Sequence, residues 1–303
     1  MSNSIVLDLN SVYDHTTHSE SLKNFSYSTK KENKIKYKSE VFHKDTEKNH
    51  DNEKNHDHDH EKNHELKGSH GKDKLQGGSG DDHLDGGTDD DDLKGSDGKD
   101  YLQGGSGDDH LDGGTGNDDL KGSDGKDYLE GGSGDDHLDG GTGNDDLKGS
   151  DGKDYLQGGF GDDLLDGGAG NDDLKGADGK DILTGNSGSD ILVGGIGNHI
   201  LNLGFKDGAK DTVLYAKGDG VDIINQFAKG IDKLGFKGIN FIDIKVSGLD
   251  TQIRLGNGIT GDAGFGTGTL LETIKGVTGF TSTHLGVGGT SVDSSNTAKF
   301  FFS

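Results

Sequence analysis

The chain of 303 residues contains no cysteine, no proline and no tryptophan, and its one methionine is Met1. Without cysteine it has neither a disulfide framework nor a thiolate-ligated metal site. No apolar run approaches the ~18 residues of a transmembrane helix, so we expect no membrane span. Hydrophobic residues make up only 26%. Such a composition is typical of disorder, unless something other than an apolar core orders the chain.

Positive charge is also scarce, with 31 basic residues against 56 acidic ones and a net charge of −25. This balance argues against a nucleic-acid partner, which requires a basic surface. Residues 1–67 carry a net charge of −2 (11 basic, 13 acidic), residues 68–202 carry −23 (10 basic, 33 acidic), and residues 203–303 are neutral (10 of each). We therefore divide the chain at these limits and expect the function in the middle segment.

The middle segment is an array of nonapeptides, from GSHGKDKLQ at Gly68 to GGIGNHILN ending at Asn202. Fifteen units fill it without a gap, and every one has glycine at position 1 and leucine at position 8. Position 4 is glycine in 14 units, with Asp89 as the exception, and position 6 is aspartate in 14, with His199 as the exception. A flexible low-complexity linker would not keep four positions in phase over this length.

Each position in the unit has a physical interpretation. Glycine at positions 1, 2 and 4 permits positive φ and a tight turn. Positions 7 to 9 form a short strand with leucine pointing inward. Two units make one coil, and stacked coils make a solenoid. Aspartate carboxylates and bare turn carbonyls together offer the oxygen-only environment that Ca²⁺ prefers. Two leucines per coil are too few to offset the cost of ordering the backbone, so we expect this segment to be unfolded without a cation.

The pattern G-G-x-G-x-D-x-L-x resembles the repeats-in-toxin (RTX, haemolysin-type) calcium-binding nonapeptide. The resemblance implies an all-β fold, a right-handed parallel β-roll or β-helix solenoid, with Ca²⁺ held between successive turns. It also implies secretion by a type I exporter that reads an uncleaved C-terminal signal, with folding outside the cell. The position-6 carboxylates are the ligands that the resemblance implies, namely Asp73, Asp82, Asp91, Asp100, Asp109, Asp118, Asp127, Asp136, Asp145, Asp154, Asp163, Asp172, Asp181 and Asp190.

We expect about a dozen Ca²⁺, whose charge of roughly +24 would nearly cancel the segment's −23. We expect a distorted turn at Asp89 and no standard site at His199. The position-3 aspartates are either extra ligands or solvated charges, and these are Asp97, Asp124, Asp151 and Asp178.

A longer period of three units makes near-identical turns recur along the array, as at His83, His110 and His137. Because a coil takes two units and this period takes three, successive copies should fall on opposite sides of the solenoid. The histidines then form no metal column, and the threonine turns form no flat row of the kind that an ice-binding surface needs.

Residues 203–303 are predicted to form a β-rich cap, with strands at 211–215, 221–224, 242–246 and 251–255. Position 7 becomes apolar late in the array, at Leu164, Ile182, Ile191 and Ile200. We expect the cap to cover these side chains. The ending AKFFFS resembles the hydrophobic tail of a type I secretion signal, with a core-packed terminus as the alternative. We expect no Sec-type signal peptide, because the apolar run at Ile5 is too short.

Residues 1–67 are expected to be disordered and contain the letters H-E-x-x-H at His60 to His64. A zinc protease would carry this motif on a helix. The tract is itself a crude repeat, no Met-turn exists, and too little chain precedes it for a catalytic domain, so we judge the motif fortuitous. Loose binding of Zn²⁺ or Ni²⁺ is one interpretation of the histidines and a solvated linker is the other. The histidines concerned are His50, His56, His58, His60 and His64.

Together these features predict a secreted, extracellular calcium-binding protein without catalytic activity, a component of the cell surface or matrix. Its partners would be calcium, the type I secretion machinery and a surface or matrix molecule. The alternative is that the roll serves as the secretion and folding module of an enzyme or toxin. An enzyme would need a further folded domain of ~100 residues with polar groups converging in a pocket.

Overall fold

The structure is a computed structural model that describes residues 52–55, 63–204, 208–216, 218–228, 231–237, 242–247, 250–255, 270–275 and 297–300. Within these ranges the regular structure is all β, and no residue is helical. None of the described residues forms a helix able to cross a membrane.

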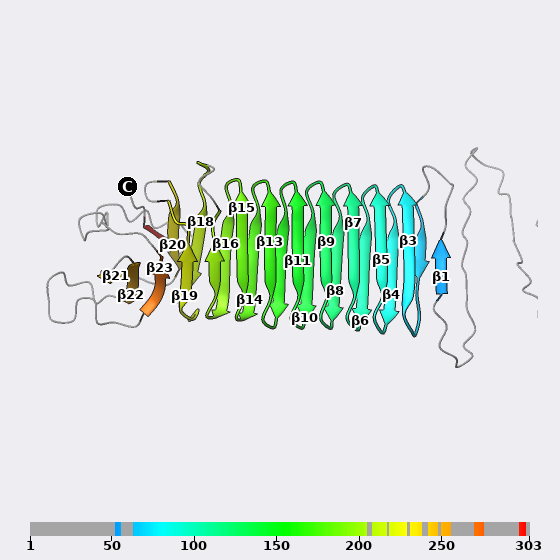
Figure 1. Ribbon diagram of the computed structural model, residues 1–303, viewed down its shortest axis with the longest axis horizontal. Helices are drawn as coiled ribbons and strands as arrows, with labels where there is room; N and C mark the ends of the chain where they lie inside the picture. Colours follow the sequence, from blue (N-terminus) through cyan, green and yellow to red (C-terminus); the bar gives the residue numbers. More distant parts are fainter. Residues whose placement is uncertain are drawn as a thin grey trace, which may run out of the picture. The chain divides into compact units, whose positions relative to one another are not determined.

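Each nonapeptide contributes one strand, and consecutive strands alternate between two sheets (Figure 1). The first sheet has 13 strands. In their order in the sheet they are β1 (Asn52–Asn55), β3 (Asp73–Ser79), β5 (Asp92–Asp97), β7 (His110–Thr115), β9 (Tyr128–Ser133), β11 (Asp146–Asp151), β13 (Leu164–Ala169), β15 (Ile182–Ser187), β17 (Ile200–Asn202), β19 (Asp222–Asn225), β23 (Leu270–Ile274), β22 (Asp250–Leu255) and β21 (Ile242–Ser247).

The second sheet has 11 strands. They are β2 (Glu65–Lys67), β4 (His83–Thr88), β6 (Tyr101–Ser106), β8 (Asp119–Asp124), β10 (His137–Thr142), β12 (Tyr155–Phe160), β14 (Asp173–Gly179), β16 (Ile191–Gly197), β18 (Thr212–Ala216), β20 (Lys233–Lys237) and β24 (Thr297–Phe300). From β1 to β20 neighbouring strands are parallel, which confirms the predicted parallel β-solenoid.

The core of the solenoid is a double row of leucines. All 15 position-8 leucines, from Leu75 to Leu201, are 0–1% exposed. In the register Leu138 pairs with Leu120 on one side and Leu156 on the other, one coil away in each direction. The predicted inward leucine rows are therefore confirmed.

Both sheets extend beyond the nonapeptide array. At the N-terminal end, β1 pairs with β3 and β2 pairs with β4, although both strands lie within residues 1–67. At the C-terminal end, β18 and β20 continue one sheet and β19 continues the other. The remainder of residues 1–62 lies outside the described residues, so the expected disorder stays a prediction.

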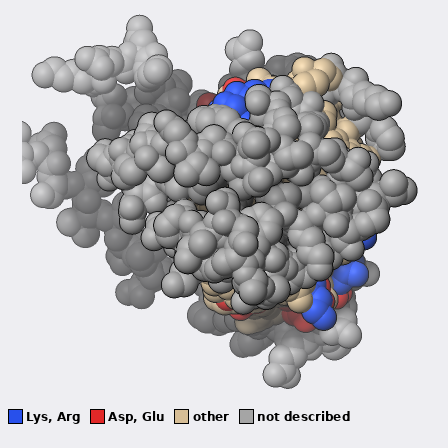
Figure 2. Space-filling model, turned by 90° about the vertical axis from the view of Figure 1, so that its left-hand side faces the viewer, with Lys and Arg blue, Asp and Glu red and all other residues tan. Residues whose placement is uncertain are grey.

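The C-terminal segment is rich in strands, as predicted. Strands β21 and β22 form an antiparallel hairpin whose closing pair is Ser247 with Asp250, and β22 pairs with β23. Strand β24 runs antiparallel to β20 and includes the first residues of the AKFFFS tail. The predicted secretion role of that tail stays a prediction. Seen from this end, the described rim shows basic and acidic side chains next to each other (Figure 2).

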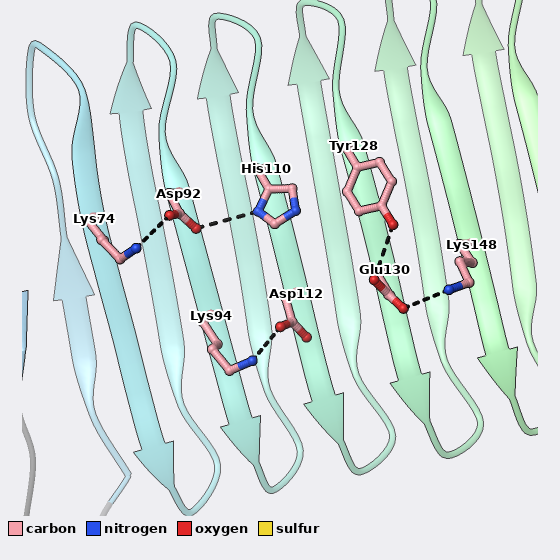
Figure 3. A network of polar contacts seen from close by, with 8 residues as sticks. All are labelled: Lys74, Asp92, Lys94, His110, Asp112, Tyr128, Glu130 and Lys148. Atoms are coloured by element: carbon pink, nitrogen blue, oxygen red, sulfur yellow. Dashed lines mark hydrogen bonds and ion pairs between the residues drawn. The ribbon is translucent and has the colours of Figure 1, made fainter.

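The outer faces show why the three-unit period matters. It places His83 in β4, His110 in β7 and His137 in β10, so successive copies alternate between sheets as predicted. Neighbouring coils consequently present different side chains to one another. Figure 3 shows the result on one sheet. Lys74 Nζ lies 3.0 Å from Asp92 Oδ2, and Asp92 Oδ1 lies 3.5 Å from His110 Nδ1. The ring of His110 stacks on the ring of Tyr128, with the two centroids 5.0 Å apart.

The adjacent row of this face behaves in the same way. Lys94 pairs with Asp112, and Lys148 pairs with Glu130 at 2.9 Å. The Lys148 ammonium lowers the pKa of Glu130, despite partial burial of that carboxyl. Exposed pairs of this kind contribute little stability each. Opposite charges face each other at Lys74 and Asp92 and at Lys94 and Asp112, whereas Asp112 and Glu130 are two acids in register.

The apolar position-7 residues remain open in the structure. Leu164 is 42% exposed, and Ile182 and Ile191 are each 38% exposed. The prediction that the C-terminal segment covers them is therefore wrong for these three side chains. The segment instead adds coils and strands to the end of the two sheets.

Candidate metal sites

The position-6 aspartates form a buried row along each edge of the roll, where a turn leads into a strand. All 14 are 0–5% exposed. From Asp91 to Asp190, each Oδ1 accepts a hydrogen bond of 2.7–3.0 Å from the main-chain N–H of the aspartate one coil earlier. These bonds number twelve. Each row is thus a ladder of aspartates joined from coil to coil.

The second carboxylate oxygen has no such partner. In eleven of these residues Oδ2 is fully buried and accepts no hydrogen bond. They are Asp82, Asp91, Asp100, Asp109, Asp118, Asp127, Asp136, Asp145, Asp154, Asp163 and Asp172. A buried carboxylate oxygen without a partner is strongly destabilising. The recurrence of this free oxygen at the same position indicates that these eleven turns are built to hold a cation.

Main-chain carbonyls face the same space as these oxygens. A Cβ built on Gly113 would lie 2.6 Å from Asp118 Oδ2 and 2.7 Å from the carbonyl oxygen of Gly131 in the next coil. Gly122 shows the same pair of neighbours, Asp127 Oδ2 at 2.3 Å and the Gly140 carbonyl oxygen at 2.6 Å. In these two turns one carboxylate oxygen and one carbonyl oxygen therefore lie close to the same point.

This donor set fits calcium. Ca²⁺ takes six to eight hard oxygen ligands and accepts carboxylates and main-chain carbonyls alike. Among the described residues, no three side chains of His, Cys, Asp or Glu cluster to hold a metal. The free Oδ2 atoms and the neighbouring turn carbonyls are the oxygens that would hold the ion. When bound, calcium would neutralise the aspartate rows and satisfy the free oxygens.

The glycine positions differ in what they require. Positions 2 and 4 have positive φ, as predicted, for example +107° at Gly132 and +134° at Gly134. Position 1 does not adopt positive φ. There glycine is required because a Cβ on Gly131 would lie 2.4 Å from Asp136 Oδ2. The position-1 glycine thus makes room for the carboxylate.

The structure adds three aspartates that the nonapeptide pattern missed. Asp211, Asp222 and Asp232 are 2–5% exposed and continue the two rows. Their Oδ1 atoms accept the N–H groups of Asp190, His199 and Asp211 at 3.0–3.1 Å. The sequence spacing lengthens to between 21 and 23 residues, which breaks the period. The signal available in the sequence was the order Asp-x-apolar, which each shares with the repeat.

The two exceptions to the pattern behave differently. Asp89 keeps the turn with φ of +73°, where the position-4 glycines Gly80 and Gly98 have 111° and 132°. The φ of Asp89 is thus smaller than that of these glycines, and strand β4 before it has the usual length. His199 occupies the position-6 place, 1% exposed, with Nδ1 3.1 Å from Asp181 Oδ2. Burial lowers the pKa of His199, but Asp181 and Asp222 outweigh burial and raise it overall.

The position-3 aspartates lie away from the rows. Asp97 and Asp124 are exposed, and their Oδ1 atoms accept the hydroxyl groups of Thr115 and Thr142 at 3.0 and 3.1 Å. This geometry favours the interpretation of solvated charge over that of extra ligands.

His64, the second histidine of the H-E-x-x-H letters, lies at the start of one aspartate row. Its N–H donates to Asp82 Oδ1 at 2.6 Å, and strand β2 follows directly. A zincin helix through His64 is incompatible with this arrangement. The other histidines proposed for Zn²⁺ or Ni²⁺ lie outside the described residues.

The fold and the two carboxylate rows define a β-solenoid of the calcium-roll class. The family model of the RTX calcium-binding nonapeptide repeat matches residues 67–102, 85–120, 112–147, 139–174, 148–183 and 166–201. Residues 67–201 therefore belong to the RTX calcium-binding nonapeptide repeat family.

No curated protein matches the chain significantly. Among solved structures, the extracellular lipase LipA from Serratia marcescens is similar at 20% identity and a TM-score of 0.31. The similarity covers 66% of this chain, which spans 38% of the length of the lipase chain.

Burial raises the pKa of eight of the row carboxyls, although the amide hydrogen bond that each of them accepts lowers it. The pKa rises to about 6 for Asp109, Asp136 and Asp145. It rises to about 7 for Asp91, Asp100, Asp127, Asp154 and Asp163, where neighbouring row carboxylates add repulsion.

These raised pKa values predict that protonation of the row carboxyls stabilises the fold when calcium is absent. The folded carboxyls bind protons more tightly than unfolded ones, whose pKa is about 4. Without calcium, stability is therefore greatest below about pH 4 and is lost as the pH rises to about 7. Protein stripped of calcium on a chelating resin should show more β-sheet circular dichroism at pH 4.5 than at pH 8. With calcium present the trend reverses, because protons compete for the carboxylates. Equal β-sheet signals at both pH values without calcium would contradict the raised pKa values.

A substitution in the row should weaken calcium binding far more than one outside it. Asp136→Ala removes the acceptor of the Asp118 N–H and a buried Oδ2 atom that accepts no hydrogen bond. We expect the apparent calcium affinity to fall roughly ten- to a hundredfold. The control, Asp139→Ala at the half-buried position 9 of strand β10, should change it less than about twofold. Calcium titrations monitored by circular dichroism measure both affinities. Equal losses would mean that position 6 of the nonapeptide is not the ligand position.

Proposed function

We propose that this chain is a secreted, extracellular calcium-binding repeat protein whose roll folds around about a dozen Ca²⁺. The observation that carries the proposal is the set of eleven buried Oδ2 atoms without hydrogen-bond partners. Twelve aspartate pairs joined across adjacent coils give the matching number of places.

Export through a type I secretion system is part of this proposal. Folding that depends on calcium suits such a route, because the chain would stay unfolded where calcium is scarce and fold where it is abundant. The family match over residues 67–201 supports it.

We further propose a non-catalytic role at the cell surface or in the matrix, with a surface or matrix molecule as partner. In the described part of the roll, the buried leucines form the core and the buried aspartates line the turns. Both sets of side chains serve folding. We assign the contact with this partner to the strand-rich segment after the roll.

The deciding experiment is a calcium titration of the full chain with measured stoichiometry. Equilibrium dialysis against ⁴⁵Ca²⁺ should saturate at about a dozen ions per chain, with circular dichroism changing over the same calcium range. Saturation at one or two ions would overturn the proposal.

A further inference from the structure

The inner face of the roll changes where the nonapeptide array ends. Position 1 is glycine in every unit and is buried from Gly77 to Gly194. Three large side chains take the same inward place after the array, each 0–2% exposed: Leu203, Tyr215 and Phe236. The packing and the register identify the place. A Cβ built on Gly185 would lie 3.0 Å from the Leu203 carbonyl oxygen, and β18 pairs in register with both β16 and β20.

These side chains double the apolar core of each coil. A coil of the array buries two leucines, one from each unit. The coil that contains β17 and β18 buries four apolar side chains, Leu201, Leu203, Val213 and Tyr215. The coil that contains β19 and β20 also buries four, Ile224, Phe227, Leu234 and Phe236. Because apolar burial is the main stabilising term of a fold, these two coils depend less on bound ions than the array does.

The turn at His199 has an imidazole ring where the other turns have a carboxylate. The Asp181 N–H donates to His199 Nδ1 at 3.2 Å, a bond that an aspartate Oδ1 accepts elsewhere in the row. A Cβ built on Gly194 would lie 2.5 Å from the ring carbon Cδ2, whereas one on Gly131 would lie 2.4 Å from Asp136 Oδ2. A carbon atom therefore occupies the place of the free oxygen, and it offers no lone pair to a cation.

Beyond His199, protein groups satisfy the polar atoms of the turns. The Tyr215 hydroxyl lies 2.7 Å from the carbonyl oxygens of both Asp219 and Gly220, in the turn between β18 and β19. Asp232 Oδ2 accepts the Ala228 N–H at 2.6 Å. The corresponding Oδ2 atom accepts no hydrogen bond in eleven turns of the array. These later turns therefore need no cation for the oxygens named here.

We propose that the coils built from β17 to β20 need no calcium and stay folded when the array loses its ions. The inference rests on the proposed function only for the array, whose calcium requirement these coils do not share. Side chains fill the inner face that glycine leaves open in the array, and protein donors take over the role of the ions in the turns. It also refines the export proposal, because the array alone is then the part that calcium switches.

The test is hydrogen–deuterium exchange of the full chain at pH 8, measured by mass spectrometry in calcium and in excess chelator. In chelator the amides of β18 and β20 should exchange at least about tenfold more slowly than those of β8 and β10. In calcium both regions should exchange slowly. Fast exchange of β18 and β20 in chelator would overturn the inference and leave the proposed function intact. Slow exchange of β8 and β10 in chelator would overturn the proposed function, and with it the contrast inferred here.

Phe236→Ala tests whether the apolar side chains are the cause. This variant removes the largest fully buried side chain of the described residues, so β18 and β20 should lose their slow exchange in chelator. Leu138→Ala is the matched control, because Leu138 is also fully buried but lies in the array, and the slow exchange of β18 and β20 should persist. If Phe236→Ala does not fold even in calcium, Phe236→Leu should show a smaller loss in the same two strands. Wild-type exchange in the folded Phe236 variant would overturn the role given to the apolar core.

Discussion

Removing calcium from the full chain should abolish most of its β-sheet circular dichroism, and returning calcium should restore it. The reason is the mismatch between a thin core and a large buried charge. Two leucine rows are the only apolar filling over residues 68–202, while the flanking aspartates are 0–5% exposed. Without a cation those carboxylates must take up protons or return to water, and near pH 8 the second outcome is favoured. We expect the loss to be cooperative, because each aspartate contacts the next coil.

Magnesium provides the control for this experiment. Mg²⁺ has the same charge as Ca²⁺ but demands small octahedral shells and gives up water reluctantly. At equal concentration it should fail to restore the β-sheet signal, which separates specific binding from general charge screening. A β-sheet signal that persists in excess chelator at pH 8 would contradict the role assigned to the carboxylate rows.

The second large effect should come from adding one methyl group to a turn. A Cβ built on Gly143, at position 4, would lie 1.5 Å from the carbonyl oxygen of Gly125 in the adjacent coil. The residue also has φ of +138°, which side chains other than glycine rarely adopt. Gly143→Ala must therefore push two coils apart. We expect the free energy of unfolding in saturating calcium to fall by more than about 3 kcal/mol, with a higher calcium midpoint.

Gly71→Ala is the matched control, because it isolates the backbone cost. Gly71 also has positive φ, at +91°, but its Cβ would meet nothing within 4 Å. This variant should lose only about 1 kcal/mol, and calcium titrations monitored by circular dichroism with urea unfolding measure both. Similar losses in the two variants would show that conformational strain, and not coil spacing, sets the requirement for glycine.

The period of the sequence predicted much of this fold. Because Leu and Asp recur in phase, their burial in rows was predictable from Leu75 to Leu201 and from Asp73 to Asp190. The role of each residue within a turn was harder to predict from the sequence. That a position-1 glycine such as Gly131 makes room for a carboxylate, and does not supply positive φ, depends on the packing of one coil on the next.

The ends of the roll were harder to predict, for a physical reason. A coil there needs only an inward apolar residue and a buried acceptor, and the loops between them are free to lengthen. Asp211 and Asp222 satisfy this requirement at spacings that a nonapeptide period does not contain. At the opposite end the spacing of 18 residues is kept, but His64 takes the place of an aspartate one coil before Asp82.

The sequence repeats in blocks of three nonapeptides, whereas one coil takes two, and this difference determines what happens when a block is duplicated or lost. A block of three nonapeptides is one and a half coils, so gaining or losing one block would turn everything after it by half a revolution. All downstream strands would exchange sheets, yet the leucines would still point inward and the aspartates would still line an edge, because both edges are built alike. Duplication therefore changes which side of the molecule carries the C-terminal strands while leaving the interior intact. Gain or loss of two blocks would restore the original orientation.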